Sequence, residues 1–404
     1  MSTSLLYHGF GIVGYKYVHT RYENGTIIFR ITHDKFSHKC SNCNSKRLVC
    51  RGKLMRRFRT IPIGLKPVFI EIEIQRVFCL VCQVVRQVKL AFAKWRRTYT
   101  KVFERYALSL SRVMTISDVA KHLGVSWGTI KDIQKKYLLK RYAHPSLKKL
   151  DRIAIDEISI GKGHRYLTVV LNLTTGAVIF VGDGKGADAL APFFNRLKRS
   201  KTKVKAVAID MSPAYIAAVM DNLPKAAIVF DHFHVIKMYN EKLSGFRRAL
   251  YNQAEKTSEK HVLKGTRWLL MKNPENLNIE KDEHKRLAEA LKLNQPLATA
   301  YYLKEDLRQF WKQNNKAEAK KHLLHWVAKA ESTKIPMLNK FAKTLRAHMF
   351  GLLSFYSYSI STGPLEGTNN KIKTLQKQAY GFRDLLFFKL KILALHESKY
   401  ALIG

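Results

Sequence analysis

Two aspartates lie in or directly after apolar runs that are typical of buried strands. Asp156 follows Ile153-Ala-Ile155, and Asp210 follows Ala206-Val-Ala-Ile209. A carboxylate in such a run is costly unless it is paired or bound to a metal ion. Because adjacent strands lie about 4.8 Å apart, two such side chains could share one divalent cation. The alternative for each aspartate alone is a paired structural carboxylate.

The residues around these aspartates predict the elements that hold them. Three strand-like runs joined by short turns are followed by strands that alternate with helices, which is the order of a ribonuclease-H-like core. The five expected strands cover residues 152–159, 166–173, 177–181, 204–209 and 226–230. The two expected helices cover residues 189–199 and 213–222.

A third acid, Glu366, lies far along the chain within Ser361-Thr-Gly-Pro-Leu-Glu-Gly-Thr-Asn-Asn-Lys-Ile-Lys373. Pro364 suits the first turn of a helix, so a helix is expected to begin here. Lys373 follows two turns after Glu366 on the same face, and Lys371 is nearby. These two lysines are expected to contact phosphate, and a solvated helix face is the alternative.

The interval of 156 residues between Asp210 and Glu366 is longer than such a core needs. Residues 241–350 carry apolar residues at helical spacing with Lys and Glu on the other faces, which indicates an all-helical insertion domain. Three tryptophans lie in it, Trp268, Trp311 and Trp326. Core packing is the simplest explanation of each, and stacking on an unpaired nucleobase is the functional alternative.

All five cysteines lie before residue 83, and four of them form two Cys-x-x-Cys pairs, Cys40/Cys43 and Cys79/Cys82. Two such pairs have the spacing of a four-cysteine structural zinc site. Disulfides are the alternative, but they fit poorly with a chain that is expected in the cytosol. Cys50 is left over and is expected to be a small buried residue.

Residues 116–133 have the apolar spacing of a helix-turn-helix. Ser117 and Ser126 are expected to cap its two helices, and Gly124 is expected to form the turn between them. An ordinary helical hairpin is the alternative. Ser126 and the free face of the second helix are expected to contact DNA in the major groove, with this face presenting Trp127, Thr129, Lys131 and Gln134.

The formal net charge of the 404-residue chain is +42, of which residues 1–150 carry +23 and residues 151–404 carry +19. The apolar fraction of 46% is that of a globular protein and not of a disordered polycation. The expected partner is therefore a polyanion, by default nucleic acid. The basic segment Lys94-Trp-Arg-Arg97 adds Trp95, Arg96 and Arg97 to the expected DNA contacts.

Two classes of function are disfavoured by what the sequence lacks. No apolar run reaches the roughly 18 residues that span a bilayer, and the first residues do not form a cleavable leader. The expected location is therefore the cytoplasm, in association with the nucleoid, with no membrane partner. Gly182-Asp-Gly-Lys-Gly186 lacks the spacing and the Ser/Thr of a phosphate-binding loop, so no nucleotide cofactor is expected.

The chain resembles bacterial insertion-sequence transposases of the DDE class, and in particular the group called ISL-three. The resemblance covers nearly the whole sequence: the cysteine pairs, the helix-turn-helix, the three acids and the Glu-Gly-x-Asn-x-x-Ile segment that begins at Glu366. It implies that Asp156, Asp210 and Glu366 form a catalytic triad. It also implies a supporting role for Asp231 and His234, which match a motif of related transposases that carry a helical insertion.

The resemblance implies a multidomain α+β chain. A zinc-binding β module precedes a helix-turn-helix domain, and a ribonuclease-H-like α/β core is interrupted by an all-α insertion before its C-terminal part. The expected boundaries, in that order, are residues 1–92, 93–145, 150–240, 241–350 and 351–404.

The chemistry implied by the resemblance is cleavage and transfer of DNA strands at the terminal inverted repeats of an insertion sequence. The three carboxylates would hold two Mg²⁺ or Mn²⁺ ions about 3.5–4 Å apart. His234 is expected to orient a neighbour or contact phosphate. Pairing of two ends implies a homodimer or larger assembly on DNA. The alternatives are a transposase-derived DNA-binding regulator without catalysis and another ribonuclease-H-like nuclease, such as a junction resolvase.

Overall fold

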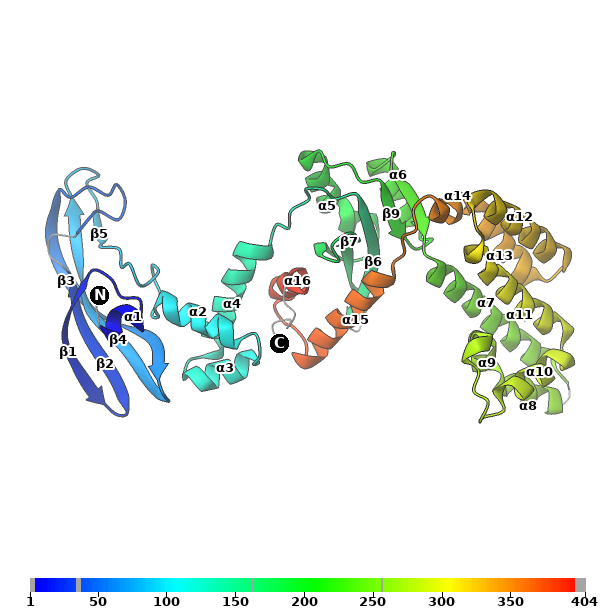
Figure 1. The fold of residues 1–404 in the computed structure, drawn as a ribbon, viewed down its shortest axis with the longest axis horizontal. Helices are drawn as coiled ribbons and strands as arrows, with labels where there is room; N and C mark the ends of the chain where they lie inside the picture. Colours follow the sequence, from blue (N-terminus) through cyan, green and yellow to red (C-terminus); the bar gives the residue numbers. More distant parts are fainter. Residues whose placement is uncertain (1–3, 34–37, 162, 256, 397–404) are drawn as a thin grey trace. The chain divides into compact units, whose positions relative to one another are not determined.

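The computed structural model describes residues 4–33, 38–161, 163–255 and 257–396 of the chain (Figure 1). It divides into two compact units: residues 1–143 with 375–404, and residues 144–374. The segment 351–404, expected to complete the core, is thus divided between the units. No helix in the described part of the chain is long and apolar enough to cross a membrane.

The first unit begins with a twisted sheet in the order β1-β2-β4-β3, with β5 paired to β4. Strands β2 and β4 are parallel, and the other pairs are antiparallel. In β4, Ile70, Ile72 and Ile74 are buried, as the alternating pattern predicts. A short helix, α1 (Leu5–His8), precedes the strands β1 (Tyr15–Glu23), β2 (Thr26–His33), β3 (Leu48–Ile63), β4 (Lys66–Cys79) and β5 (Val85–Gln87).

The helix-turn-helix follows the sheet in the same unit. It consists of α3 (Ile116–Leu123) and α4 (Trp127–Tyr142), and α2 (Lys101–Leu110) precedes it. Gly124 takes the left-handed conformation at the turn, with φ 61°, as predicted. Ser126 caps α4 as predicted, but α3 is capped by Thr115 and not by Ser117. The structure starts α3 before Ser117, so Thr115 is the residue whose hydroxyl reaches a free backbone N–H.

The sequence did not predict that a helix from outside the helix-turn-helix packs against α4. This helix, α16 (Leu385–Ala394), belongs to the first unit, and its Phe387, Leu390 and Ala394 share one buried cluster with Ile130 and Ile133 of α4. The DNA-binding module predicted at residues 93–145 therefore also includes a C-terminal helix in its core.

The second unit holds a five-stranded sheet in the order β10-β9-β6-β7-β8. Strands β6, β7 and β8 are antiparallel, whereas β9 and β10 run parallel to β6. All five predicted strands are present, as are both predicted helices, α5 (Ala187–Ser200) and α6 (Pro213–Asn222). The strands are β6 (Arg152–Gly161), β7 (Arg165–Asn172), β8 (Val178–Asp183), β9 (Ala206–Ile209) and β10 (Ala227–Phe230).

After β10, the described residues up to Leu353 form helices and no strand, as predicted for residues 241–350. A later helix, α15 (Gly363–Gln378), carries Glu366. The intervening helices are α7 (His232–Gln253), α8 (Thr257–Gly265), α9 (Arg267–Met271), α10 (Glu283–Leu293), α11 (Gln295–Arg308), α12 (Lys316–Ser332), α13 (Pro336–Ala347) and α14 (Met349–Leu353).

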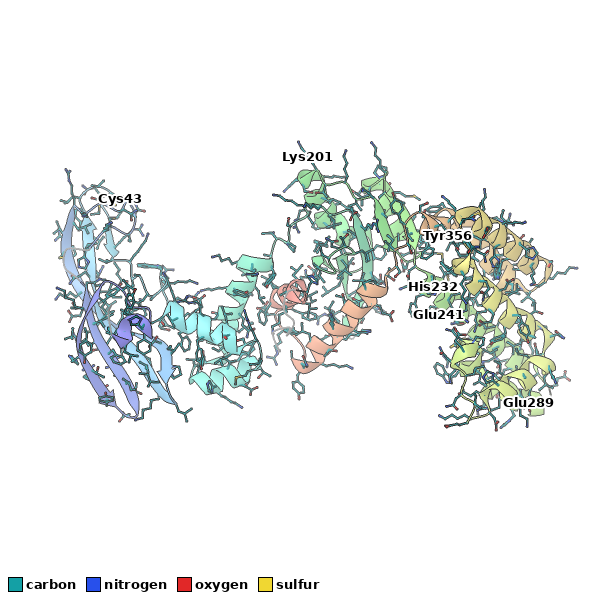
Figure 2. The ribbon with its side chains drawn as sticks, in the orientation of Figure 1. Cys43, Lys201, His232, Glu241, Glu289 and Tyr356 are labelled. Atoms are coloured by element: carbon teal, nitrogen blue, oxygen red, sulfur yellow. The ribbon has the colours of Figure 1, made fainter. Side chains whose placement is uncertain are left out.

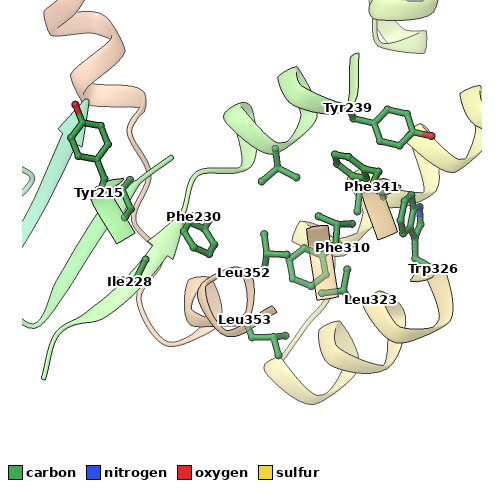
Figure 3. Close-up of a cluster of buried hydrophobic side chains, with 14 of the residues drawn as sticks. Tyr215, Ile228, Phe230, Tyr239, Phe310, Leu323, Trp326, Phe341, Leu352 and Leu353 are labelled. Atoms are coloured by element: carbon green, nitrogen blue, oxygen red, sulfur yellow. The ribbon is translucent and has the colours of Figure 1, made fainter. Parts of the chain in front are cut away.

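One hydrophobic cluster connects the sheet with these helices (Figure 3). It runs from Ile228 and Phe230 of β10 to Tyr239, Trp326 and Phe341. At the junction, α14 approaches β10 so closely that a Cβ added to Gly351 would lie 2.4 Å from the Phe230 ring. The absence of a side chain at Gly351 therefore allows this contact.

We expect Gly351→Ala to destabilise the second unit by about 1–3 kcal/mol, because the new methyl group must displace the Phe230 ring. A thermal unfolding scan measures this. Gly245→Ala is the matched control, since Gly245 lies inside α7 with no neighbouring atom within 4 Å of its added Cβ. It should be neutral or stabilise by up to about 1 kcal/mol. Equal melting temperatures for the two variants would contradict the close approach.

Candidate active site and DNA-binding surfaces

The two predicted strand aspartates lie on neighbouring strands. Asp156 is on β6, which pairs in parallel with β9 through Ala154 and Ala208, and Asp210 directly follows β9. Two residues beyond this pair lie Asp156 on β6 and Asp210 just after β9. The parallel register therefore places both carboxylates at the same level, at the end where β9 stops.

Asp156 is half-buried, and both of its carboxylate oxygens accept hydrogen bonds. The Glu157 backbone N–H donates to Oδ1 over 2.9 Å, and the Asn369 amide Nδ2 donates to Oδ2 over 2.9 Å. Burial raises the pKa of Asp156 to about 6, while the nearby His234 opposes this rise and the charges of Glu157 and Asp210 add to it.

Asp210 borders a cavity of about 260 Å³ between the end of β9 and the first turns of α7. Its Oδ1 accepts a hydrogen bond from the Ser212 backbone N–H over 3.0 Å. The cavity wall combines cationic, apolar and acidic groups, contributed by Met211, His234, Lys237, Met238 and Glu241. Figure 2 labels His232 and Glu241 on this helix. The predicted supporting residue His234 therefore lies near both aspartates.

Glu366 is exposed in the first turn of α15, where Pro364 also lies. The segment before it is anchored by the predicted supporting residue Asp231, because the Thr362 backbone N–H donates to Asp231 Oδ1 over 3.2 Å. Asp231 is buried, and its second oxygen has no hydrogen-bond partner within the described structure. Lys371 and Lys373 are exposed further along α15, as expected for phosphate contacts or a solvated face.

The carboxylate oxygens of the three predicted acids do not all lie within 4.8 Å of one another. Among the described residues, only the four cysteines form a group of three or more potential metal ligands whose atoms all lie within 4.8 Å of one another. The structure thus places Asp156 and Asp210 on neighbouring strands and joins Asp156 to Asn369 by a hydrogen bond. Glu366 is exposed on the same helix as Asn369. The role of the triad as metal ligands stays a prediction.

The three tryptophans of the helical region have different environments. Trp326 is completely buried, and its Nε1 donates to the Leu303 carbonyl over 2.7 Å, so the core-packing interpretation is correct for it and base stacking is not. Trp311 is half-buried with its ring against His232. Trp268 is 65% exposed, and the Arg267 guanidinium lies over its ring. Stacking on a base stays a prediction for Trp268 and Trp311.

The four paired cysteines converge in the first unit, where Figure 2 labels Cys43. The Sγ atoms of Cys40 and Cys82 are 3.5 Å apart, and so are those of Cys43 and Cys79. A tetrahedral ion with bonds of about 2.3 Å to sulfur separates its ligands by about 3.8 Å, so this spacing suits zinc. Cys50 lies elsewhere on β3 and is exposed, in contrast to its predicted burial.

The predicted DNA-contacting face of α4 is partly covered. Lys131 and Lys135 lie 3.1 and 2.8 Å from Asp384 Oδ2, and Gln134 is fully buried. Burial alone would raise the pKa of Asp384, but hydrogen bonds from Lys135, the Phe387 amide and Lys131 lower it far below its ordinary value. The expectation that Gln134 is free on the surface is therefore wrong. Lys131 is half-buried and paired with the cap residue of α16, and its contact with DNA stays a prediction.

Other predicted DNA contacts are accessible. Ser126 and Trp127 are exposed at the start of α4, and Thr129 is half-buried there. Trp95 and Arg96 are exposed beside a cavity of about 280 Å³ whose wall also contains the cations Arg56, Lys89, Lys94 and Lys101. Arg97 is half-buried, and its carbonyl accepts a hydrogen bond from Arg56 over 2.8 Å.

Comparison with known families assigns these features to one group of proteins. A model described as the zinc-finger of transposase IS204/IS1001/IS1096/IS1165 matches residues 37–82, and the helix-turn-helix domain of transposase family ISL3 matches residues 88–138. The ISL3 transposase model matches residues 153–392, which is more than half of the chain. The chain belongs to the ISL3 family of insertion-sequence transposases.

Individual relatives of this transposase extend over most of its length. It is 33% identical to the transposase for insertion sequence element IS1001 of Bordetella parapertussis, over 88% of each chain. It is 28% identical to the transposase for insertion sequence element IS1557 of Mycobacterium tuberculosis, over 85% of this chain and 82% of that one. A chain of the Drosophila P element transposase strand transfer complex is similar at a TM-score of 0.38 and 11% identity, covering 76% of this chain and 94% of that chain.

Two residues of the transposase make contacts that the sequence did not predict, Asn369, which is part of the Glu-Gly-x-Asn-x-x-Ile segment, and Asp384. Asn369 lies three residues after Glu366, so the helical repeat alone would have placed it on the same face one turn later. Asp384 precedes the apolar run Leu385-Leu-Phe-Phe388, which is the pattern of a helix cap. That pattern predicts the cap but not the ion pairs with Lys131 and Lys135, which are about 250 residues earlier in the chain.

The cysteine cluster with the zinc-finger family match supports structural zinc. We expect the purified chain to hold about one zinc ion, and Cys40→Ser to lose most of it and to melt at a lower temperature, because zinc binding contributes folding free energy. Elemental analysis in reducing buffer and a thermal scan measure both effects. Cys50→Ser is the control and should keep its zinc. Undiminished zinc in Cys40→Ser would contradict the four-cysteine site.

Proposed function

We propose that this transposase binds the terminal inverted repeats of its insertion sequence and cleaves and joins DNA strands through Asp156, Asp210 and Glu366. The observation that carries the proposal is the hydrogen bond from Asn369, one turn beyond Glu366, to Asp156, together with the parallel register that sets Asp156 beside Asp210. The strand order supports a ribonuclease-H-like core, which the helical residues 241–350 would interrupt as an insertion.

The donor set of the proposed site suits Mg²⁺ or Mn²⁺, because these cations prefer carboxylate oxygens to nitrogen or sulfur. The residues that would hold the cations are Asp156, Asp210 and Glu366. When bound, the cations would activate the attacking oxygen and stabilise the leaving one. The protein itself contributes orientation, because Glu157 and Asn369 fix Asp156, and Asp231 fixes the segment before Glu366.

Basic side chains near the site would bind the DNA strand. Lys371 and Lys373 on α15 and His234 on α7 are the groups that we propose to contact phosphate. Two element ends must meet for strand transfer, so we also propose a homodimer or larger assembly on DNA.

We expect Asp156→Asn and Glu366→Gln to reduce cleavage of end-containing DNA in Mg²⁺ on the order of 10³-fold or more, with DNA binding retained. Asp221→Asn is the matched control, because Asp221 is an exposed carboxylate at the end of α6 and outside the proposed site. Gel analysis of cleavage and a binding assay on the same DNA separate the two effects. Binding without cleavage by the unaltered chain would favour the alternative of a regulator, and full cleavage by either site variant would refute the triad.

We propose that α4 contacts the major groove through its first turn and the face that α16 leaves open. Asp132 is exposed on α4, and Lys136 is half-buried one turn later. Trp127 and Thr129 lie in the first turn. The cations around Trp95 and Arg96 would bind backbone phosphates beside this contact. Binding through so many cations should weaken steeply as the salt concentration rises.

We expect Lys136→Ala to weaken binding of end DNA about three- to ten-fold and to lower the salt dependence, because it removes a partly exposed cation from α4. Lys131→Ala is the comparison, since Lys131 is already paired with Asp384, and we expect a smaller loss. Fluorescence anisotropy with end DNA and with random DNA measures both. A larger loss for Lys131→Ala would mean that the face covered by α16 is the one that contacts DNA.

A further inference from the structure

Asn369 connects two parts of the second unit that are far apart in the sequence. It lies in α15, 7% exposed, and its Nδ2 donates to Asp156 Oδ2 over 2.9 Å. The two residues are 213 positions apart. Glu366 precedes Asn369 by three residues, which on a helix places both side chains on neighbouring positions of one face. The contact therefore couples the helix that carries Glu366 to the strand that carries Asp156.

The other half of the Asn369 amide is also buried. Its Oδ1 has no hydrogen-bond partner within the described structure, although a buried carbonyl oxygen is normally paired. Oδ1 and Nδ2 are bonded to the same carbon, so Oδ1 lies beside the contact with Asp156. Side-chain carbonyl oxygens of this kind are among the ligands of hard divalent cations. The unpaired oxygen is thus a second observation that points to a cation at this place.

The amide suits this position better than the chemically similar carboxylate. The amide N–H donates to a carboxylate oxygen of Asp156 and holds that side chain in one orientation. A carboxylate at position 369 would place a like charge beside Asp156 and remove the donor. Asp156 Oδ1 is already held by the Glu157 backbone N–H, so Asn369 completes the restraint on the Asp156 side chain.

We infer that Asn369 is a positioning residue of the metal site: its Nδ2 fixes Asp156 relative to the helix of Glu366, and its Oδ1 provides a neutral oxygen for the same divalent cation. The inference rests on the proposed function, because it takes Asp156 as a ligand. It assigns to Asn369 a role in metal affinity in addition to helix packing.

Mn²⁺ binding to the full-length, zinc-loaded chain tests this role without relying on catalysis. Electron paramagnetic resonance counts free Mn²⁺ during a titration, and Asp156→Asn defines the binding that belongs to the proposed site. We expect Asn369→Ala to weaken that binding at least about ten-fold, as is common when a group that orients a ligand is removed. Asn370→Ala is the matched control, since Asn370 is the next residue on α15 and is exposed, and it should leave the affinity unchanged.

A thermal scan of each variant separates positioning from packing. If Asn369→Ala unfolds at a much lower temperature, Asn369→Ser replaces it, because serine is polar but too short to reach Asp156. We expect Asn369→Ser to show the same loss of Mn²⁺ affinity with the melting temperature retained. The Mn²⁺ concentration for half-maximal cleavage should rise by a similar factor, whereas a purely structural role would lower the amount of active protein and leave this concentration unchanged.

The outcomes distinguish the inference from the proposed function. If Asp156→Asn binds Mn²⁺ as tightly as the unaltered chain, no cation depends on Asp156 and the proposed function itself fails. If Asp156→Asn loses binding while Asn369→Ala and Asn369→Ser keep it, the triad stands and the role of Asn369 is refuted. Loss of binding in all three variants, with Asn370→Ala unaffected, supports both.

Discussion

The second unit is organised around a half-buried carboxylate on the central strand of its sheet. Asp156 lies on β6, the central strand, between the apolar Ile155 and the acidic Glu157 and at the level where β9 ends. Because this side chain is only partly exposed, water stabilises its charge incompletely, and neighbouring polar groups must contribute. Those groups come from three places: the backbone at Glu157, the amide of Asn369 on α15, and His234 on α7. Each of these elements must hold its position for Asp156 to keep these neighbours.

The helical region between β10 and α15 positions α15 relative to the sheet, although the two are far apart in the sequence. It begins at Asp231 and returns at Thr362, where the two residues form a hydrogen bond 131 positions apart. Between them, the buried cluster from Phe230 to Trp326 and Phe341 packs the helices onto the end of the sheet, and Gly351 permits the closest approach. The helices therefore stabilise the place from which α15 starts, and the position of α15 determines where Asn369 and Glu366 lie.

In the first unit, the few acids arrange a large excess of cations. Glu71 accepts from Arg21 and Arg57 at 2.8–3.0 Å within the sheet, and Asp384 pairs with Lys131 and Lys135 on α4. Pairs of this kind hold long cationic side chains in one orientation more than they contribute net stability. The cations that remain accessible, such as those around Trp95, are the ones that we propose to contact DNA.

Local patterns in the sequence were sufficient for many of the strands and helices and for the cysteine cluster. The period of apolar residues predicted the five strands around Asp156 and Asp210 and the helices after β10, and the Cys-x-x-Cys pairs predicted the cysteine cluster, because each signal spans only a few neighbouring residues. Gly124 and Ser126 were predicted for the same reason. The contacts between distant segments were not predictable in this way. The apolar residues Ile130 and Ile133 predict that other helices pack against α4. Only the folded chain shows that α16 is one of these helices and that Gln134 is buried. The bond between Asn369 and Asp156 likewise depends on packing across 213 positions, which no local period encodes.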